Sequence, residues 1–200
     1  MLCSGAGSNL GALLAAEREG RLGPARIALV IVNRAGAGAI ARAEAAGVPV
    51  RVIPHEGQTD RRAYDALLVE ALREANVEVV ALAGFMRLVT SVLLDAFGGR
   101  VLNIHPSLLP AFPGLHAQRQ ALQHGCKVSG CTVHLVDEGL DAGPIVAQAA
   151  VTVLDEDDEA TLTARILVEE HRIYAEALRL VAEKRIVIEG RRTRVREHAA

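Results

Sequence analysis

Short, continuously apolar runs alternate with amphipathic segments through the first half of the chain. A run without polar interruption is typical of a strand that is buried on both faces of a parallel sheet. Between these runs apolar residues recur at helical spacing, with capping residues at the start and glycine at the end. The alternation predicts an α/β fold with a doubly wound, mostly parallel, Rossmann-like sheet that is flanked by helices.

The same pattern places the elements of this first half. Strands are expected at residues 27–32, 48–53, 77–83 and 100–105, and helices at 37–46, 60–75 and 90–96, with one more beginning near Ser8. Thr59 or Asp60 can cap the helix at 60–75. Helical spacing assigns its apolar stripe to Tyr64, Leu67, Leu68, Ala71 and Leu72.

The pattern changes after residue 115. A helix is expected at 116–124, strands at 128–136 and 145–153, a long helix at 158–183 and a terminal hairpin at 186–195. The long helix is expected to turn these residues inward: Leu162, Ile166, Ile173, Leu178 and Val181. The chain thus predicts a C-terminal antiparallel edge and a long helix. No linker or repeat interrupts it, so a single domain is expected over residues 1–200.

Composition excludes several classes of partner. The chain has 200 residues and a formal net charge of −2, with acidic and basic residues interspersed, which argues against a nucleic-acid partner. The basic segment at 191–196 is interpreted as a solvated tail. No apolar run can span a bilayer and no secretory leader is seen, so a cytoplasmic protein without a membrane partner is expected. Cys3, Cys126 and Cys131 lack metal-type spacing, and the latter two are interpreted as small buried hydrophobes.

The expected strand at 100–105 ends in a polar motif. Alternate side chains of a strand share a face, so Asn103 and His105 project the same way and Ile104 faces the other way. Pro106 cannot donate to a sheet ladder, so the strand should end before it. In an open α/β sheet ligands bind where strands end in this manner. An amide and an imidazole are therefore expected side by side at a ligand site.

A glycine-rich segment, Ser4-Gly-Ala-Gly-Ser-Asn-Leu, precedes the first expected helix. Glycines let the backbone approach an anion, and the helix start would direct free N–H groups at it. Gly5 and Gly7 fit a dinucleotide fingerprint, but Leu10 stands at the third glycine position. The second strand also ends in Asn33 rather than in an acid that could hold a ribose. A single phosphomonoester suits this loop better than a pyrophosphate; an ordinary strand-to-helix turn is equally consistent with it.

Asp141 lies in the segment Leu140-Asp-Ala-Gly-Pro. A carboxylate beside an imidazole fixes its tautomer and stabilises the imidazolium, so Asp141 is a candidate partner of His105. A plain turn is the alternative reading, because Asp and Gly favour turns. The other histidines considered have no such neighbours and are interpreted as surface or structural groups: His55, His124 and His171.

Four segments, in this order and spacing, resemble the phosphoribosylglycinamide formyltransferase family, which contains folate-dependent enzymes of purine synthesis. They are Ser4-Gly-Ala-Gly-Ser-Asn-Leu, Leu82-Ala-Gly-Phe-Met-Arg-Leu, Asn103-Ile-His-Pro-Ser-Leu-Leu-Pro with Phe112-Pro-Gly-Leu, and Leu140-Asp-Ala-Gly-Pro. The resemblance implies the formyltransferase fold. It also implies transfer of the formyl group of 10-formyltetrahydrofolate to the amine of 5-phosphoribosylglycinamide, giving formylglycinamide ribonucleotide and tetrahydrofolate in de novo purine (IMP) biosynthesis.

The resemblance also implies roles for individual residues. The catalytic trio is Asn103, His105 and Asp141. Contacts to phosphoribosylglycinamide are expected from Gly7, Ser8 and Asn9, at the phosphate, and from Glu170. Contacts to formyltetrahydrofolate are expected from Arg61, Phe85, Met86, Arg87, Leu88, Val89, Asn103, Asp137, Glu138, Gly139, Leu140 and Asp141.

The implied mechanism is chemically consistent with these residue types. The substrate amine attacks the formyl carbon, and negative charge develops on the formyl oxygen, where preorganised donors lower the barrier. The hypothesis is that the Asn103 amide and a protonated His105 are these donors, with Asp141 stabilising the imidazolium. Asp141 also positions a water that moves the proton from the amine to the leaving nitrogen. The formyl donor is a co-substrate, and neither a metal nor a covalent enzyme intermediate is required.

Two other functions remain open. A formyltetrahydrofolate hydrolase shares the Asn-His-Asp chemistry and passes the formyl group to water, although the loop from Ser4 to Asn9 is of the glycinamide type. A non-catalytic nucleotide-binding module is the second, since fold does not imply function. The partners in every case are small molecules, and the chain is expected to be a monomer or a homodimer.

Three features depart from the family pattern. Only Met1, Leu2 and Cys3 precede the glycine-rich loop, where members have a full central strand, so the first strand is expected to be truncated. Leu167 stands where many relatives have a polar or basic residue. Gln118 stands where some relatives have a second histidine. The expected consequence at Leu167 is a less polar edge of the substrate site.

Overall fold

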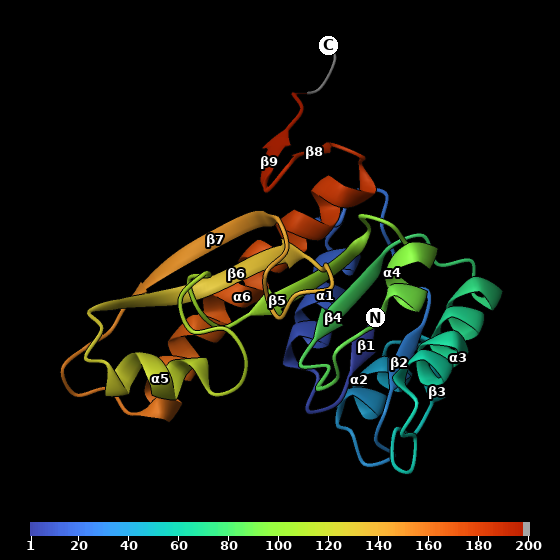
Figure 1. Ribbon diagram of the computed structural model, residues 1–200, viewed down its shortest axis with the longest axis horizontal. Helices are drawn as coiled ribbons and strands as arrows, with labels where there is room; N and C mark the ends of the chain where they lie inside the picture. Colours follow the sequence, from blue (N-terminus) through green and yellow to red (C-terminus); the bar gives the residue numbers. More distant parts are fainter. Residues whose placement is uncertain (198–200) are drawn as a thin grey trace.

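The computed structural model describes residues 1–197 (Figure 1). Within them a seven-stranded sheet has the strand order β3-β2-β1-β4-β5-β6-β7, and β8 and β9 form a separate two-stranded sheet. The strands are β1 (Leu2–Cys3), β2 (Val30–Val32), β3 (Val50–Val52), β4 (Val80–Ala83), β5 (Val101–His105), β6 (Val128–Leu135), β7 (Ile145–Thr152), β8 (Ile186–Glu189) and β9 (Arg192–Val195). Strands β1 to β5 pair in parallel, and β6 and β7 add an antiparallel edge. The predicted fold class is confirmed. Residues 198–200 of the expected domain lie outside the described residues.

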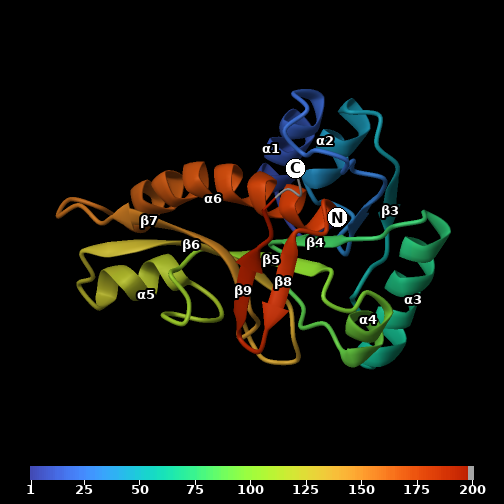
Figure 2. The same cartoon turned by 90° about the horizontal axis from the view of Figure 1, so that it is seen from above.

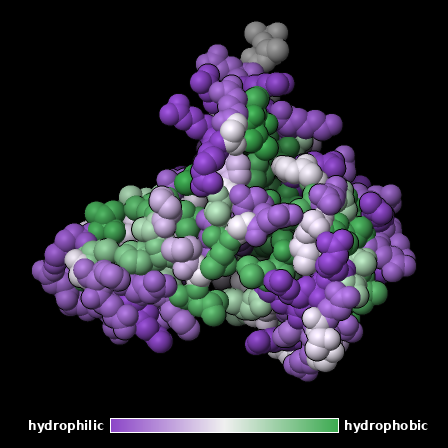
Figure 3. Space-filling view, in the orientation of Figure 1, coloured by the Kyte–Doolittle hydropathy of each residue, from purple (hydrophilic) through white to green (hydrophobic). Residues whose placement is uncertain are grey.

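Helices cover both faces of this sheet. They are α1 (Ser8–Arg18), α2 (Ala39–Ala45), α3 (Arg61–Glu74), α4 (Ser91–Ala96), α5 (Ala117–Gln123) and α6 (Glu159–Ala182). Figure 2 shows α1, α2 and α6 on one side of the sheet and α3 and α4 on the other. Polar residues cover the ends near α5 and α3 and the C-terminal hairpin, while apolar residues are exposed between them on the face seen in Figure 3.

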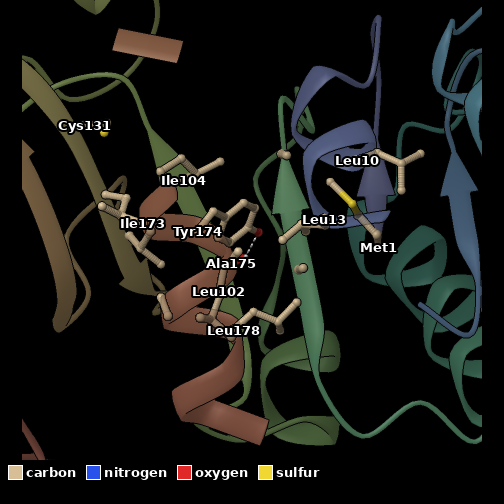
Figure 4. Close-up of a cluster of buried hydrophobic side chains, with 14 of the residues drawn as sticks. Met1, Leu10, Leu13, Leu102, Ile104, Cys131, Ile173, Tyr174, Ala175 and Leu178 are labelled. Atoms are coloured by element: carbon tan, nitrogen blue, oxygen red, sulfur yellow. Dashed lines mark hydrogen bonds between the residues drawn. The ribbon is translucent and has the colours of Figure 1, made fainter. Parts of the chain in front are cut away.

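Alternate residues of the central strands enter two apolar cores. Val30, Val32 and Leu102 pack with α1, α2 and α6, whereas Ile31 and Leu82 pack with α3 and α4. This two-sided burial explains why the strands read as continuous apolar runs. The residues expected to turn inward from the long helix are all buried: Leu162, Ile166, Ile173, Leu178 and Val181. On the same helix, the Tyr174 hydroxyl donates to the Leu82 carbonyl oxygen at 2.7 Å (Figure 4).

The predicted starts of α3 and α6 agree with the structure because a capping residue precedes each helix. The Asp60 carboxylate accepts from the backbone of Arg62 and Ala63, and Asp158 forms a capping box with Thr161. The expected hairpin at 186–195 is formed by β8 and β9.

Other expectations were wrong at the level of single elements. The strand predicted at 27–32 is reduced to Val30–Val32, and that at 77–83 to Val80–Ala83. Both flank β1, whose two residues pair only with Ile31–Val32 and Leu82–Ala83 among the described residues. Leu67, predicted in the buried stripe of α3, is 44% exposed. Cys131 is buried as expected, but Cys126 is only partly buried.

Candidate active site

Strand β5 carries Asn103 and His105 to the boundary between the parallel and antiparallel parts of the sheet. The strand ends at His105, directly before Pro106, as predicted. Antiparallel pairing with β6 places Asn103 opposite His134 and His105 opposite Thr132. Polar side chains of β5 and β6 therefore lie opposite one another.

Asp141 joins this group from the connection between β6 and β7. Its Oδ2 atom lies 3.3 Å from His105 Nδ1 and accepts from the Gly114 N–H at 2.8 Å. Its Oδ1 atom lies 3.7 Å from His134 Nε2. Asp141 has a backbone φ of 48°, a left-handed conformation in which a non-glycine residue is uncommon. The fold therefore brings the predicted trio together, with Asp141 meeting His105 as expected.

His105 has one polar partner at each of its two ring nitrogens. Nε2 faces the Phe112 carbonyl oxygen at 2.9 Å, and Nδ1 faces the Asp141 carboxylate. Both partners are acceptors, and only the imidazolium carries a proton on each nitrogen. The ring is 4% exposed. Two acceptors therefore face the two ring nitrogens of His105.

Several groups keep Asp141 ionised. Burial opposes the charged form. The contact with His134, the Gly114 N–H and the charges of the two nearby imidazoles act in the other direction. These interactions prevail, so the pKa of Asp141 lies below its ordinary value. The carboxylate is then available to the imidazolium and to a bridging water.

His134 is a site residue that the sequence analysis missed. Its Nδ1 lies 3.0 Å from the Leu135 carbonyl oxygen, and its Nε2 lies 3.2 Å from the Asn103 amide nitrogen. The second N–H of that amide stays free to donate elsewhere. The available signal was a histidine inside a predicted strand, but its position opposite Asn103 depends on the register of β6.

The glycine-rich loop leads into α1 as expected, with Ser8 as the first helical residue. Gly7 has φ 72°, and a Cβ there would lie 2.8 Å from Ala39, so no larger residue fits. Ser4 connects this loop to the segment at 84–89: its N–H donates to Gly84, and its hydroxyl accepts from the Met86 N–H at 3.0 Å. The predicted phosphate loop and the predicted folate segment are thus joined.

Asn9 and Glu170 meet although they are distant in sequence. The Asn9 amide nitrogen donates to Glu170 Oε2 at 2.8 Å, and each residue is 7% exposed. Burial raises the pKa of Glu170 above its ordinary value, and the hydrogen bond from Asn9 offsets this only in part. Asn9 Oδ1 is buried and has no hydrogen-bond partner among residues 1–197. This pair offers both an acceptor and an acid to a ligand at the start of α1.

The burial of Glu170 gives a prediction about stability. A carboxyl group whose pKa is raised on folding costs stability once the pH rises above its unfolded pKa, because the unfolded state ionises more easily. We expect Glu170→Gln to increase the free energy of unfolding at pH 7, and the gain to shrink as the pH falls through the raised pKa of Glu170 and to vanish below about 4. Urea unfolding at several pH values measures this. A Gln variant that is less stable than the parent at pH 7 contradicts it.

The residues predicted to bind folate differ in exposure. Met86, Leu88 and Leu140 are more than half exposed and offer apolar surface. Arg87 instead lies over the ring of Tyr64, 4.4 Å from its centre. Arg61 is exposed at the start of α3. The remaining predicted residues are partly buried or lie on the exposed loop at 137–140.

Asp65 fixes the end of this folate segment and was also missed. It is 2% exposed, and its Oδ2 accepts from both the N–H and the hydroxyl of Thr90, the residue that caps α4. A carboxylate next to Tyr64 on the buried stripe of α3 was the available signal. Asp65 thus ties the segment at 85–89 to the helix beneath it.

We expect Asp65→Asn to raise the KM for formyltetrahydrofolate, the co-substrate that the resemblance implies, about threefold to tenfold, because the two hydrogen bonds from Thr90 lose the charge of the carboxylate oxygen that accepts both. The KM for the amine substrate should change little. Steady-state kinetics with each substrate varied in turn measures this, and Asp95→Asn, at an exposed position of α4, is the control. Equal changes in both KM values contradict the assignment.

Within residues 1–197, no cluster of three His, Cys, Asp or Glu side chains is arranged to hold a metal ion. In the same part of the chain, no helix combines the length and apolar character needed to cross a membrane.

Comparison with known proteins identifies the family. A sequence model described as formyl transferase matches residues 1–178. The chain belongs to the formyl transferase family. The matched region includes Asn103, His105, Asp141 and Glu170, whereas the hairpin of β8 and β9 lies beyond it.

Individual members of the formyl transferase family are similar over most of the chain. It is 51% identical over 183 residues to the trifunctional purine biosynthetic protein adenosine-3 of Drosophila pseudoobscura pseudoobscura, an alignment that covers 91% of this chain and 13% of that protein. The chain spans only 13% to 18% of the trifunctional relatives. The phosphoribosylglycinamide formyltransferase of Bacillus subtilis is 42% identical over 179 residues, covering 90% of this chain and 91% of that protein.

A solved structure of a family member agrees with the fold in detail. Glycinamide ribonucleotide transformylase 1 from Symbiobacterium toebii has a TM-score of 0.95 and 57% sequence identity, covering 98% of this chain and 92% of that one. The likeness therefore includes both the parallel sheet and its antiparallel edge.

Proposed function

We propose that the chain is a phosphoribosylglycinamide formyltransferase. It would transfer the formyl group of 10-formyltetrahydrofolate to the amine of 5-phosphoribosylglycinamide in purine biosynthesis. The observation that carries this proposal is the meeting of Asn103, His105 and Asp141 at the end of β5. The names of the similar proteins, phosphoribosylglycinamide formyltransferase and glycinamide ribonucleotide transformylase, support it.

The trio supplies the donors that the transition state requires. As the amine attacks, the formyl oxygen becomes negative, and preorganised N–H donors stabilise it. In the proposed reaction the free N–H of the Asn103 amide is one donor. The Nε2–H of His105 is the other, after exchanging the Phe112 carbonyl oxygen for the formyl oxygen. Asp141 remains on Nδ1 and stabilises the imidazolium throughout.

Asp141 is also proposed to serve the proton transfer. The attacking amine must lose a proton, and the folate nitrogen must gain one when the C–N bond breaks. A water held by the Asp141 carboxylate can accept the first and deliver the second without a covalent enzyme intermediate. The lowered pKa of Asp141 suits this role, because the group stays ionised at neutral pH.

The two substrates are proposed to bind on either side of the trio. Gly7, Ser8 and Asn9 would hold the phosphate of phosphoribosylglycinamide at the start of α1, with Glu170 as a further contact. The folate would bind along residues 85–89 and the loop at 137–141, with Arg61 near its charged tail. The hydrogen bonds of Ser4 to Gly84 and Met86 support a fixed relation between the two subsites.

A formyl-transfer assay with and without glycinamide ribonucleotide tests the proposal. We expect tetrahydrofolate to form only when the amine substrate is present, together with one equivalent of formylated product. Formate release without the amine would instead indicate a formyltetrahydrofolate hydrolase. Binding of both ligands without turnover would indicate a non-catalytic module. Either outcome overturns the transferase assignment.

A further inference from the structure

The C-terminal hairpin contacts the connection that carries Asp141. Strands β8 and β9 form their own sheet after α6 ends, outside the seven-stranded sheet. Figure 1 shows the hairpin beyond the end of α6, projecting away from the seven-stranded sheet. The backbones of Arg185 and Arg196 close its base by hydrogen bonding, and the Arg185 side chain also donates to the Arg196 carbonyl oxygen. Residues 191–196 are exposed apart from the partly buried Thr193, as expected of a solvated segment, and residues 192–195 form β9 of the expected hairpin.

Two side chains of the hairpin bind this connection. Arg191 Nη2 donates to the carbonyl oxygen of Ala142 at 2.9 Å, and the Thr193 hydroxyl donates to that of Ile145 at 2.6 Å. Ala142 follows Asp141 directly, and Ile145 is the first residue of β7. The hairpin thus binds both ends of the short link that leads from Asp141 into the sheet.

This link carries a residue in an unfavourable conformation. Asp141 has φ 48°, and such a residue keeps its conformation only when several surrounding contacts fix it. On the sheet side the Leu135 N–H donates to the Pro144 carbonyl oxygen, and on the site side Gly114 binds the carboxylate. The preceding residues, 138–140, are exposed. Arg191 and Thr193 add hydrogen bonds to the link from the side of the hairpin.

We propose that the β8–β9 hairpin holds Asp141 in place, with Arg191 and Thr193 as positioning residues. The proposal rests on the catalytic role proposed for Asp141. The hairpin touches the backbone on one side of the link, and the carboxylate projects to His105 on the other. Loss of either bond allows the link to shift, and small displacements of a catalytic group reduce turnover strongly.

Kinetics of single variants test the positioning role. We expect Arg191→Ala and Thr193→Val each to lower kcat about threefold to tenfold, with little change in the KM for glycinamide ribonucleotide. Arg191→Lys should restore part of the loss, because it keeps a donor. Arg192→Ala is the matched control, since within residues 1–197 the Arg192 side chain makes no hydrogen bond or ion pair. Unchanged kcat in both Arg191→Ala and Thr193→Val overturns the proposal.

A double-mutant cycle tests whether the hairpin acts through Asp141. In an Asp141→Asn background, Arg191→Ala should cause no further loss of kcat, and in the parent it should shift the His105 ring signals in an NMR spectrum. If Asp141→Asn is impaired and Arg191→Ala still costs the same factor, the hairpin proposal alone is wrong. If Asp141→Asn turns over normally, the role proposed for Asp141 fails, and the hairpin proposal fails with it. Urea unfolding of each variant confirms that the fold is kept.

Discussion

Replacing Asp141 by asparagine is expected to lower kcat about 10²- to 10⁴-fold while the protein stays folded. The substitution removes the negative charge 3.3 Å from His105 Nδ1, so the imidazolium loses its counter-charge. It also removes the base that would hold the bridging water. The asparagine amide is isosteric, and its oxygen can still accept from the Gly114 N–H, so the backbone of the connection should be retained.

Steady-state kinetics with saturating folate and amine substrate measures this loss. Asp155→Asn is the control, because Asp155 lies on the surface, where its carboxylate pairs with Lys127. Circular dichroism and urea unfolding of both variants show whether the fold is intact. Near-normal turnover of a folded Asp141→Asn protein would refute the role assigned to Asp141.

The second large effect is expected from Gly143→Ala. A Cβ at Gly143 would lie 1.8 Å from the Leu135 carbonyl oxygen, which belongs to the backbone of β6 and cannot move aside as a side chain could. The connection must therefore shift, which disturbs the hydrogen bond from Leu135 to Pro144 and displaces Asp141. We expect a loss of about 3 kcal/mol in the free energy of unfolding and a fall in kcat of at least tenfold.

Urea unfolding and steady-state kinetics measure these two effects on the same sample. Gly98→Ala is the matched control, since the nearest atom to its added Cβ is a backbone oxygen at 4.0 Å and its φ is not positive. It should be close to the parent in both measurements. A Gly143→Ala protein with parental stability and kcat would show that the backbone around Asp141 can adapt, contrary to the geometry.

Local chemistry made much of the fold predictable. The apolar runs identified the parallel strands because residues buried on both faces carry no polar side chains, and Asp60, one of two expected caps, caps α3. The trio could be predicted in part from strand alternation, which places Asn103 and His105 on one face. Asp141 was a candidate partner of His105 by its residue type, with a plain turn as the alternative, and the structure shows the contact.

Long-range pairing explains most of what was missed. His134 joins the site only because antiparallel pairing sets it opposite Asn103, and that register is not encoded within either strand. The strand at 27–32 is shortened because its neighbour β1 pairs only with its last residues. Leu67 fits the helical spacing of the apolar residues of α3, but it lies outside the narrower set of these residues that is buried. The contacts of Arg191 and Thr193 were also missed, because each side chain binds a backbone oxygen far away in sequence.

The reversal of strand direction after β5 has a consequence for how such proteins diversify. The groups proposed to react come from one continuous stretch, residues 103–141, in which β5 pairs with β6 and the following connection returns Asp141 to His105. The residues proposed to select the acceptor, 7–9 and 170, lie outside that stretch, in α1 with its preceding loop and in α6. A descendant of this chain could therefore exchange one amine acceptor for another through changes in two helices, while the formyl-transfer chemistry is inherited unchanged.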